Sequence, residues 1–453
     1  MKVLLVHPWR PSVYGAAGIT VPPAGLLYLA AVLERGGHQV VFQDRVLSVE
    51  DLRLEGAGLV GITCHAPTFK LALSLGRRAK AAGIPVVLGG PQVTFTYEEA
   101  LESGAADFAV RGEGEETLLE LADLLSGRRD GGLGSIPGLV WKDGPSGGIV
   151  VNPDRPALED LDALPFPALP LVDLSHYRTL TVAGRQAVPI VTSRGCPFRC
   201  NFCVVPNLPQ RRWRARSVEN VVREMEWWNR ELGFSSFVFV DDNLTVDPGR
   251  LREFCALLLE KGAPFRWWCM SRADTLVRHE DLVDLMAGAG CVTVFLGLES
   301  GSDRVLAEYG KRERVETGRE AVRLLESRGI EAHASFILGS PGETREDVEA
   351  TIEYALDLDP AVVQFSILTP YPGTPLFERL KGRLVTRDWD LFDAAHAVYR
   401  HDRMEPSELE RLLVKAYRRF YGRPGRIRRS LGERGAIRRA FRVIRFLSST
   451  RGR

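Results

Sequence analysis

The stretch Val188-Pro-Ile-Val-Thr-Ser-Arg-Gly-Cys196-Pro-Phe-Arg-Cys200-Asn-Phe-Cys203 places three cysteines directly after a short apolar run. Three soft thiolate donors at this spacing can surround a single metal centre, and iron–sulfur clusters are held by cysteine thiolates, usually four of them. The next cysteines along the chain are isolated inside helix or strand patterns: Cys255, Cys269 and Cys291. A cubane held by three cysteines would leave one iron open to a small molecule, so this stretch predicts a catalytic cluster.

Two other kinds of cysteine site fit this stretch less well. A structural zinc site uses four ligands in paired knuckles, and neither a second pair nor a nearby histidine is present. A redox-active thiol triplet is the remaining alternative.

The apolar run before the cysteines is the first of six predicted strands that alternate with helices. The strands are predicted at residues 188–193, 236–242, 266–271, 291–300, 333–340 and 362–368. Helices are predicted at 218–232, 251–261 and 315–327, and Thr344 to Asp347 resembles a capping box at the start of another. Six such units predict a partial (β/α)6 TIM-like barrel over residues 186–385, in which ligands collect at the carboxyl ends of the strands.

The first 130 residues repeat the strand–helix alternation on a smaller scale. Continuous apolar strands are predicted at 2–7, 39–44, 59–63, 85–90 and 107–110, with helices at 24–35, 69–82 and 115–125. This pattern is typical of a parallel sheet covered on both faces, so we expect an α/β fold with an N-terminal Rossmann-like domain. Residues 131–185 are rich in proline and glycine and predict a connector, and residues 386–453 predict a C-terminal helical region with a basic tail.

Composition and charge limit the class of protein. The 453 residues are 45% apolar and 26% charged, which is typical of a soluble globular chain. No secretory signal is recognisable and no apolar run reaches the roughly 18 residues of a membrane span, so we expect a cytoplasmic protein. The net charge is +1, yet residues 418–453 contain 13 arginines and one glutamate. An acidic body with an arginine tail therefore excludes a nucleic-acid surface over the whole molecule.

The CxxxCxxC spacing, with aromatic Phe202 before the last cysteine, resembles the signature of radical S-adenosylmethionine (SAM) enzymes. The resemblance implies a [4Fe-4S] cluster on Cys196, Cys200 and Cys203, with SAM bound to the fourth iron and Phe202 among the cofactor contacts. An electron from an external flavodoxin- or ferredoxin-like donor would cleave SAM to methionine and a 5′-deoxyadenosyl radical. Further residues at strand ends match the family's SAM-binding motifs and imply contacts to its amino group, carboxylate, ribose and adenine: Asp241, Asp242, Asn243, Arg272, Glu299, Ile337 and Gly339.

The first domain resembles the cobalamin-binding class of the same family. The matching segments are 61–65, 89–94 and 110–115, and the implied cobalamin contacts are Thr63, His65, Gly89, Gly90, Gln92, Gly112 and Glu113. The turn after the first strand lacks GxGxxG, which disfavours NAD, and no GxxxxGK[ST] phosphate loop is present. The DxHxxG motif that carries an axial histidine in other cobalamin proteins is also absent. His7 and His65 are candidates near the cofactor, and the run 211–216 is either a cofactor contact or a solvated basic turn.

The resemblance implies a methyltransferase that acts on an unactivated carbon of a small-molecule or lipid substrate. One SAM would methylate cobalt, and a second would supply the substrate radical that accepts the methyl group. A radical cyclase or rearrangement enzyme with a tetrapyrrole- or isoprenoid-type substrate is the alternative, followed by a cobalamin or metal sensor without turnover.

Residues 434–448 place apolar side chains on one helical face and arginines on the other. A basic amphipathic helix of this kind favours peripheral contact with an anionic membrane, and nucleic acid is the weaker alternative. Docking of this helix on the acidic body is the other interpretation.

Overall fold

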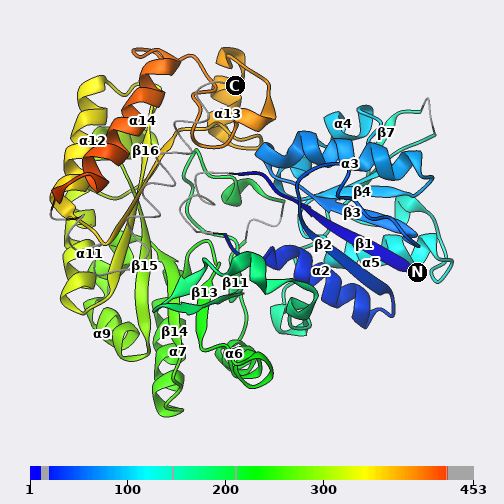
Figure 1. The fold of residues 1–453 in the computed structure, drawn as a ribbon, viewed down its shortest axis with the longest axis horizontal. Coiled ribbons are helices and arrows are strands. Elements are labelled where there is room, and N and C mark those ends of the chain that lie inside the picture. The colour runs from blue at the N-terminus through cyan, green and yellow to red at the C-terminus, as the bar shows by residue number, and fades with distance from the viewer. Residues whose placement is uncertain (12–19, 145–146, 210–211, 425, 427–453) are drawn as a thin grey trace.

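The computed structural model describes residues 1–11, 20–144, 147–209, 212–424 and 426. Two sheets, each flanked by helices, form the bulk of the molecule, with the seven-stranded N-terminal sheet on the right of Figure 1 and the six-stranded sheet on the left. Both the N-terminal Rossmann-like sheet and the six-stranded barrel sheet predicted from the sequence are present.

The N-terminal sheet has the strand order β2-β1-β3-β4-β5-β6-β7. Its strands are β1 (Lys2–Pro8), β2 (Gln39–Val46), β3 (Leu59–Thr63), β4 (Val86–Gly89), β5 (Phe108–Val110), β6 (Leu139–Lys142) and β7 (Ile149–Val151). The first five are parallel, whereas β6 and β7 are antiparallel additions at the edge. Neighbouring residues of β1 belong to different cores, Leu4 to one face and Leu5 to the other. Burial on both faces explains why these strands are continuously apolar.

Four helices cover the two faces: α2 (Ala24–Arg35), α3 (Phe69–Ala81), α4 (Pro91–Glu102) and α5 (Glu115–Leu125). Helices α2 and α5 pack together on one face, and α3 and α4 cover the other. Helix α4 was not predicted from the sequence. It begins with Pro91 immediately after Gly90, whose φ of 97° ends the preceding strand.

The predicted connector over residues 131–185 is only partly irregular. Strands β6 and β7 extend the first sheet, so that domain runs past the predicted boundary at residue 130. These two edge strands were not predicted because they are short and turn-forming residues surround them; a strand needs only a few residues to pair. The remainder, to residue 177, contains three single-turn helices, at Leu161–Ala163, Leu169–Leu171 and Leu174–Tyr177.

The second sheet contains six parallel strands in the order β10-β13-β14-β15-β16-β17. They are β10 (Val188–Ile190), β13 (Ser236–Phe239), β14 (Arg266–Ser271), β15 (Cys291–Glu299), β16 (Glu331–Leu338) and β17 (Val362–Ile367). Strands β10 and β17 lie at opposite ends of the order, so this is an open, partial barrel. The short pairs β8 (Thr181–Val182) with β9 (Arg185–Gln186) and β11 (Ser193–Arg194) with β12 (Arg214–Ala215) form separate two-stranded ribbons.

Helices follow the barrel strands on their outer side (Figure 1). They are α6 (Val218–Leu232), α7 (Pro248–Glu260), α8 (Ala273–Arg278), α9 (Glu280–Gly288), α10 (Asp303–Glu308), α11 (Val315–Ser327), α12 (Arg345–Leu358) and α13 (Pro375–Leu380). The predicted capping box at α12 is confirmed, with the Thr344 hydroxyl accepting from the Asp347 N–H at 3.2 Å. The Ser217 hydroxyl caps α6 in the same way, at 3.1 Å from the Asn220 amide nitrogen.

The C-terminal region is less helical than its sequence predicted. Residues 388–405 form turns, including the single-turn helix Trp389–Leu391, and within the described residues 386–424 the one full helix is α14 (Pro406–Tyr421). The turns follow from Asp388 and Asp393, whose carboxylates accept backbone N–H groups two residues further on and so compete with helix formation. The predicted basic helix at 434–448 lies outside the described residues.

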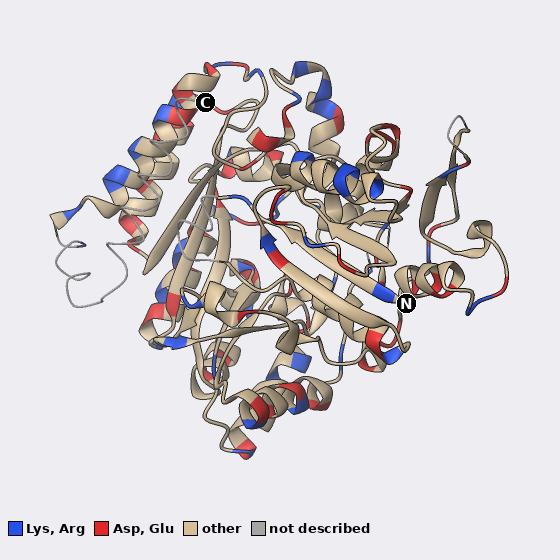
Figure 2. Ribbon diagram, turned by 45° about the vertical axis from the view of Figure 1, so that its right-hand side comes forward, with Lys and Arg blue, Asp and Glu red and all other residues tan. Residues whose placement is uncertain are grey.

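Charged residues lie mainly in the helices and loops, while the strands are largely uncharged (Figure 2). Within the part of the chain that the structure describes, no helix has the length and apolar character needed to cross a bilayer.

Candidate active site and cofactor cavity

The three clustered cysteines lie on one loop that leaves the barrel after β11. Backbone hydrogen bonds anchor this loop: the Asn201 N–H donates to Tyr309 O at 3.0 Å, and the Leu376 N–H donates to Asn201 O at 3.1 Å. The Phe202 ring packs edge-on against Tyr309 with their centroids 5.1 Å apart. Phe202 is therefore a packing residue that holds the loop against the barrel, from α10 to α13.

The thiols of Cys196, Cys200 and Cys203 are partly exposed and, like the four other cysteines, form no disulfide. Burial raises the pKa of all three, that of Cys203 to about 12. Lys311 opposes this effect at Cys200, since a nearby cation favours the thiolate. Among the described residues, no three His, Cys, Asp or Glu side chains converge closely enough for a single metal ion. The loop offers three soft donors on one segment of the chain.

Asp241 and Asn243, predicted from the sequence to bind SAM, lie buried just beyond β13. Asp241 Oδ1 accepts from the Thr192 N–H at 2.9 Å and from the Ser193 hydroxyl at 2.8 Å, which fixes the strand end before the cysteine loop. Asn243 Oδ1 accepts from the Thr245 N–H at 3.1 Å. Within the described chain, Asp241 Oδ2 and Asn243 Nδ2 are buried without a hydrogen-bond partner. Each residue therefore holds local structure with one atom and has a second polar atom still to be satisfied.

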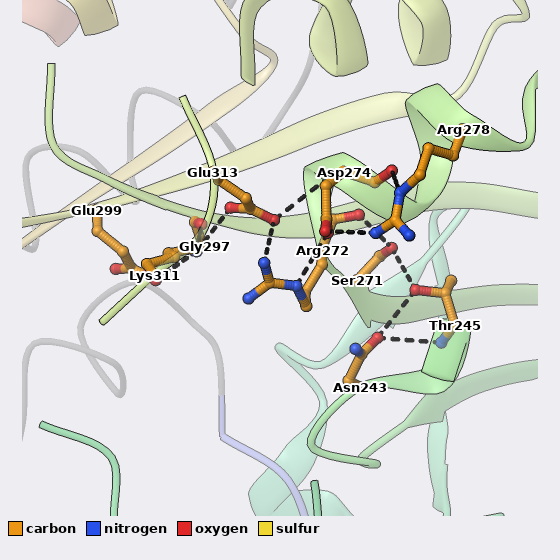
Figure 3. Close-up of polar contacts among 10 residues, drawn as sticks. All are labelled: Asn243, Thr245, Ser271, Arg272, Asp274, Arg278, Gly297, Glu299, Lys311 and Glu313. Atoms are coloured by element: carbon orange, nitrogen blue, oxygen red, sulfur yellow. Dashed lines mark hydrogen bonds and ion pairs between the residues drawn. The ribbon is translucent and has the colours of Figure 1, made fainter. Parts of the chain in front are cut away.

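A chain of buried ion pairs runs past the ends of β14 and β15 (Figure 3). Arg272 Nη2 lies 3.1 Å from Glu313 Oε1, and Lys311 Nζ lies 3.2 Å from Glu313 Oε2 and 3.1 Å from Glu299 Oε1. The Arg272 guanidinium also pairs with Asp274 at 2.9 Å and lies 4.0 Å over the Phe198 ring. The predicted SAM ligands Arg272 and Glu299 are thus joined through two residues that the motifs did not identify.

Lys311 and Glu313 were missed because their segment, 309–314, follows a helix rather than a strand. Burial lowers the pKa of Lys311, but Glu299 and Glu313 outweigh it and raise the pKa above its ordinary value. The Lys311 ammonium therefore remains charged beside Cys200. In the sequence this segment shows only alternating charges, Lys311-Arg-Glu313-Arg, and charge alternation of this kind is common on surfaces.

The predicted adenine-contacting motif forms the turn after β16. Ile337 packs with Phe202 and Tyr309, and Gly339 has a φ of 91° that other residues rarely adopt. Glu343 Oε2 accepts from the Gly339 N–H at 2.5 Å and the Ser340 N–H at 2.9 Å, while Oε1 is buried without a partner in the described part of the molecule. Burial raises the pKa of Glu343 to about 7.

A cavity of about 520 Å³ lies where the carboxyl ends of the N-terminal strands face the barrel. Its walls are largely apolar, and it reaches Gly195 and Asp242 next to the cysteine loop. Burial and the charge of Asp241 raise the pKa of Asp242 to about 6. Of the residues predicted to contact cobalamin, the lining includes Thr63, His65, Gly89, Gly90, Gly112 and Glu113.

Gln92 is the exception among the predicted cobalamin contacts, because it does not line the cavity. It lies buried in the first turn of α4, and its Nε2 is without a partner in the described structure. Gly90 explains this geometry: a Cβ atom there would lie 2.7 Å from Cys64 O, so α4 starts hard against the end of β3. Backbone this close to the strand ends forms a cradle that any larger residue would fill.

An ion-pair network joins the two domains at the rim of the cavity. Glu113 lies 2.5 Å from Arg214, and Glu115 lies 2.6 Å from Arg194. Burial raises the pKa of Glu113, but Arg214 and Arg194 outweigh it and hold the pKa below its usual value. Of the basic run at 211–216, Arg214 therefore lines the cavity, whereas Arg216 is buried in a pair with Glu224.

The residues present fit the two groups that the sequence implied. The cysteine loop supplies the soft donors that an iron–sulfur cluster uses, and Asp241, Asn243 and Glu343 retain unsatisfied buried atoms around it for a polar ligand such as SAM. The glycine cradle and apolar walls suit a large flat ligand such as a corrin.

Comparison with known proteins agrees with this division. The family model of the radical SAM superfamily matches residues 190–355, and that of the B12 binding domain matches residues 12–122. The chain is 36% identical over 442 residues to the uncharacterized methyltransferase PH0819 of Pyrococcus horikoshii, covering 94% of this chain and 93% of that protein. It is 31% identical over 433 residues to the anaerobic magnesium-protoporphyrin IX monomethyl ester cyclase of Rubrivivax gelatinosus, covering 93% and 77%.

The fold also matches a solved structure. TsrM, a radical SAM methyltransferase from Kitasatospora setae with cobalamin and a [4Fe-4S] cluster bound, superposes with a TM-score of 0.73 at 20% identity, covering 100% of both chains. The two family models imply a [4Fe-4S] cluster, SAM and cobalamin, and the chain is a radical SAM enzyme similar to a protein named a methyltransferase. It belongs to the cobalamin-binding class of the radical SAM superfamily.

Proposed function

We propose that this enzyme methylates an unactivated carbon of an apolar small molecule, with cobalamin as the methyl carrier. The observation that carries the proposal is the cavity itself: it is lined by Gly61 and Gly89 of the N-terminal sheet and equally by Gly195, next to Cys196, and Asp242. A substrate carbon at this junction would be within reach of groups held by both domains.

The two cofactors supply the chemistry and the protein supplies positions. When bound, the cluster and SAM would supply a radical for hydrogen-atom abstraction, and cobalamin would supply the methyl group. Cys196, Cys200 and Cys203 would hold the cluster, and the glycine cradle would hold the corrin. Asp242 stands between Asp241 and Asn243 in the sequence and lines the cavity. Its pKa is raised to about 6, so its carboxyl group can hold or release a proton near neutral pH.

The apolar walls determine the class of substrate that we propose. Residues from both domains contribute them, including Leu26, Ile62, Leu88, Val205 and Leu208. Such a surface favours a lipid or tetrapyrrole-like molecule over a strongly charged one, because a charged substrate would lose its hydration without compensation.

Anaerobic reconstitution with iron, sulfide, cobalamin and SAM tests the methyl transfer. We expect S-adenosylhomocysteine and 5′-deoxyadenosine to form together when a substrate is supplied. Deoxyadenosine without S-adenosylhomocysteine would contradict methyl transfer and favour a radical cyclase, the activity in the name of the Rubrivivax relative. The Cys203→Ala variant should form neither product, whereas Cys255→Ala, which removes a buried thiol in α7, should form both.

We further propose an external flavodoxin- or ferredoxin-like electron donor, a cytoplasmic location and peripheral contact with anionic membranes through residues 434–448. The support for membrane contact is the sequence, which alternates arginines with an apolar helical stripe, and nucleic acid is the less favoured partner. Removing residues 430–453 should abolish co-sedimentation with anionic liposomes. Unchanged sedimentation would exclude the tail as the membrane contact.

A further inference from the structure

His7 occupies a central place beneath the cofactor cavity. It belongs to β1, which lies between β2 and β3 in the sheet, and its side chain contributes to the cavity lining. From β1 the chain continues to β2 at one edge of the sheet, and the following strands, from β3 onward, are added on the other side of β1. Open parallel sheets of this order bind their ligands at this switch point, outside the carboxyl ends of the strands.

A hydrogen-bonded relay holds the His7 ring. Its Nδ1 lies 2.7 Å from Asp44 Oδ1, and the Tyr177 hydroxyl donates to Asp44 Oδ2 at 2.7 Å. The Asp44 side chain is 6% exposed and that of His7 is 14% exposed. A carboxylate only accepts, so the proton of a neutral His7 ring lies on Nδ1 and the lone pair on Nε2.

This arrangement is the one that proteins use to present a histidine to a metal. A ligating histidine commonly donates its second ring N–H to a carboxylate, which fixes the tautomer and orients the ring. Three separate elements, β1, β2 and the single-turn helix Leu174–Tyr177, contribute one residue each to the relay. Building such a relay at the wall of a cavity is more than the packing of an isolated histidine requires.

We propose that His7 supplies an axial nitrogen ligand, through Nε2, to the cobalt of bound cobalamin, and that Asp44 and Tyr177 are its positioning residues. The proposal rests on cobalamin as the methyl carrier in the proposed function. It gives the chain an axial imidazole although the DxHxxG motif is absent.

His65 is the competing imidazole and therefore the matched control. It lines the same cavity from the end of β3. Its backbone N–H is engaged by the Thr68 hydroxyl at 3.1 Å, but among the described residues no carboxylate contacts its ring. The His65 side chain takes part in a capping box with the Thr68 backbone, and it lacks the carboxylate that orients His7.

Electron paramagnetic resonance of the cobalt tests the ligand directly. The full-length protein, with histidine labelled by ¹⁵N or left unlabelled, is loaded with cobinamide, which lacks the nucleotide base of cobalamin, and reduced to Co(II). We expect nitrogen splitting that changes with the isotope in the wild type and in His65→Phe, and that is lost in His7→Phe. Splitting that ignores the isotope, or that disappears in His65→Phe instead, would overturn the assignment.

The Asp44→Asn variant retains His7 and changes only the group that orients its ring. It therefore tests the proposal even if the His7→Phe variant does not fold. Loss of a carboxylate behind a metal-bound histidine weakens binding by about 10- to 100-fold, and we expect that loss in cobinamide affinity. Unchanged affinity would contradict the positioning role. Corrin absorbance and S-adenosylhomocysteine production separate the two proposals. If both are observed but the splitting does not depend on the isotope, only the assignment of His7 as the cobalt ligand is overturned. If the protein takes up no cobalamin, both this assignment and the proposed function are overturned.

Discussion

Lys311 shows how single residues set the chemistry of this site. The residue is 6% exposed, and its ammonium lies between the carboxylates of Glu299 and Glu313. Glu313 also pairs with Arg272. The cation offsets part of the effect of burial on the Cys200 thiol. Buried charges of this kind persist because each is paired, and removing one member leaves the others without compensation.

Replacing Lys311 by methionine should destabilise the fold by about 3–5 kcal/mol, since two buried carboxylates lose their shared cation. The midpoint of denaturant unfolding measures the change. Lys415→Met is the matched control, because the Lys415–Glu349 pair lies at the surface and should contribute less than about 1 kcal/mol. Equal shifts in the two variants would contradict the buried network.

Glu343 should make stability depend on pH. The side chain is fully buried and its pKa is raised from 4.5 to about 7, so the folded protein binds a proton that the unfolded chain has already released. Stability is then fully present below pH 4.5 and falls as the pH rises to 7, by roughly 3 kcal/mol.

The Glu343→Gln variant should abolish this loss, since the amide stays neutral at every pH. Thermal unfolding of the cofactor-free protein between pH 5 and 8 should therefore show a flatter profile for the variant. The exposed Glu98→Gln replacement is the control and should follow the wild type. If the wild type were instead to gain stability from pH 5 to 7 relative to Glu343→Gln, the raised pKa of Glu343 would be refuted.

At the scale of elements, the edge of the barrel sheet is closed by the C-terminal region. On the outer edge of β17, tyrosine hydroxyls of α14 satisfy the backbone groups that no strand pairs with. The Tyr417 hydroxyl bonds to the N–H and the C=O of Phe365. The Tyr421 hydroxyl bonds to the N–H and the C=O of Val363. Ile367 continues the row by donating to Ala394 O at 2.8 Å. Covering an edge strand in this way prevents pairing with another chain.

Removing the Tyr417 hydroxyl should cost about 1–3 kcal/mol, because two backbone groups of Phe365 lose their buried partner while the ring packing is kept. The Tyr417→Phe variant should also speed amide hydrogen exchange at Phe365. Tyr97→Phe, in which the ring stays beside Arg111, is the control and should leave both quantities unchanged. Unaltered exchange at Phe365 would show that the hydroxyl does not protect the edge.

At the scale of the whole molecule, the segment after the barrel returns to the N-terminal domain. Trp389 packs against Phe69 of α3 with ring centroids 6.5 Å apart, and its indole N–H donates to Glu99 of α4 at 2.9 Å. Asp390 pairs with Arg10 nearby. Together with the ion pairs of Glu113 and Glu115, these contacts fix the two sheets on opposite sides of the cavity.

Trp389→Ala should destabilise the protein by about 3–5 kcal/mol, since a large buried ring leaves a cavity in the core shared by the two domains. Limited proteolysis should then cut within residues 384–400 before the barrel itself unfolds. Trp227→Ala removes a partly exposed ring of α6 and should not create this site of cleavage. Identical fragment patterns from both variants would argue against Trp389 as the domain contact.

The sequence alone determined the local pattern of this protein. The apolar strands of both sheets and helices such as Ala24–Arg35 and Val218–Leu232 were predicted with the bounds that the structure has or close to them. The cysteine spacing identified the family, because that motif is contiguous. The glycine-containing loops of the first domain identified its cobalamin-binding class in the same way. All the contact residues predicted from these loops, except Gln92, line the cavity.

Only the tertiary structure determined what depends on contacts between distant segments. Four such contacts are the Arg272–Glu313 ion pair, the pairing of β6 with β5, the return of Trp389 to α3, and the relay from Tyr177 through Asp44 to His7. A pattern of apolar residues carries information over a few turns of helix or one strand, whereas these contacts depend on how whole elements pack. The physical reason is that periodicity records which face is buried but not which partner buries it.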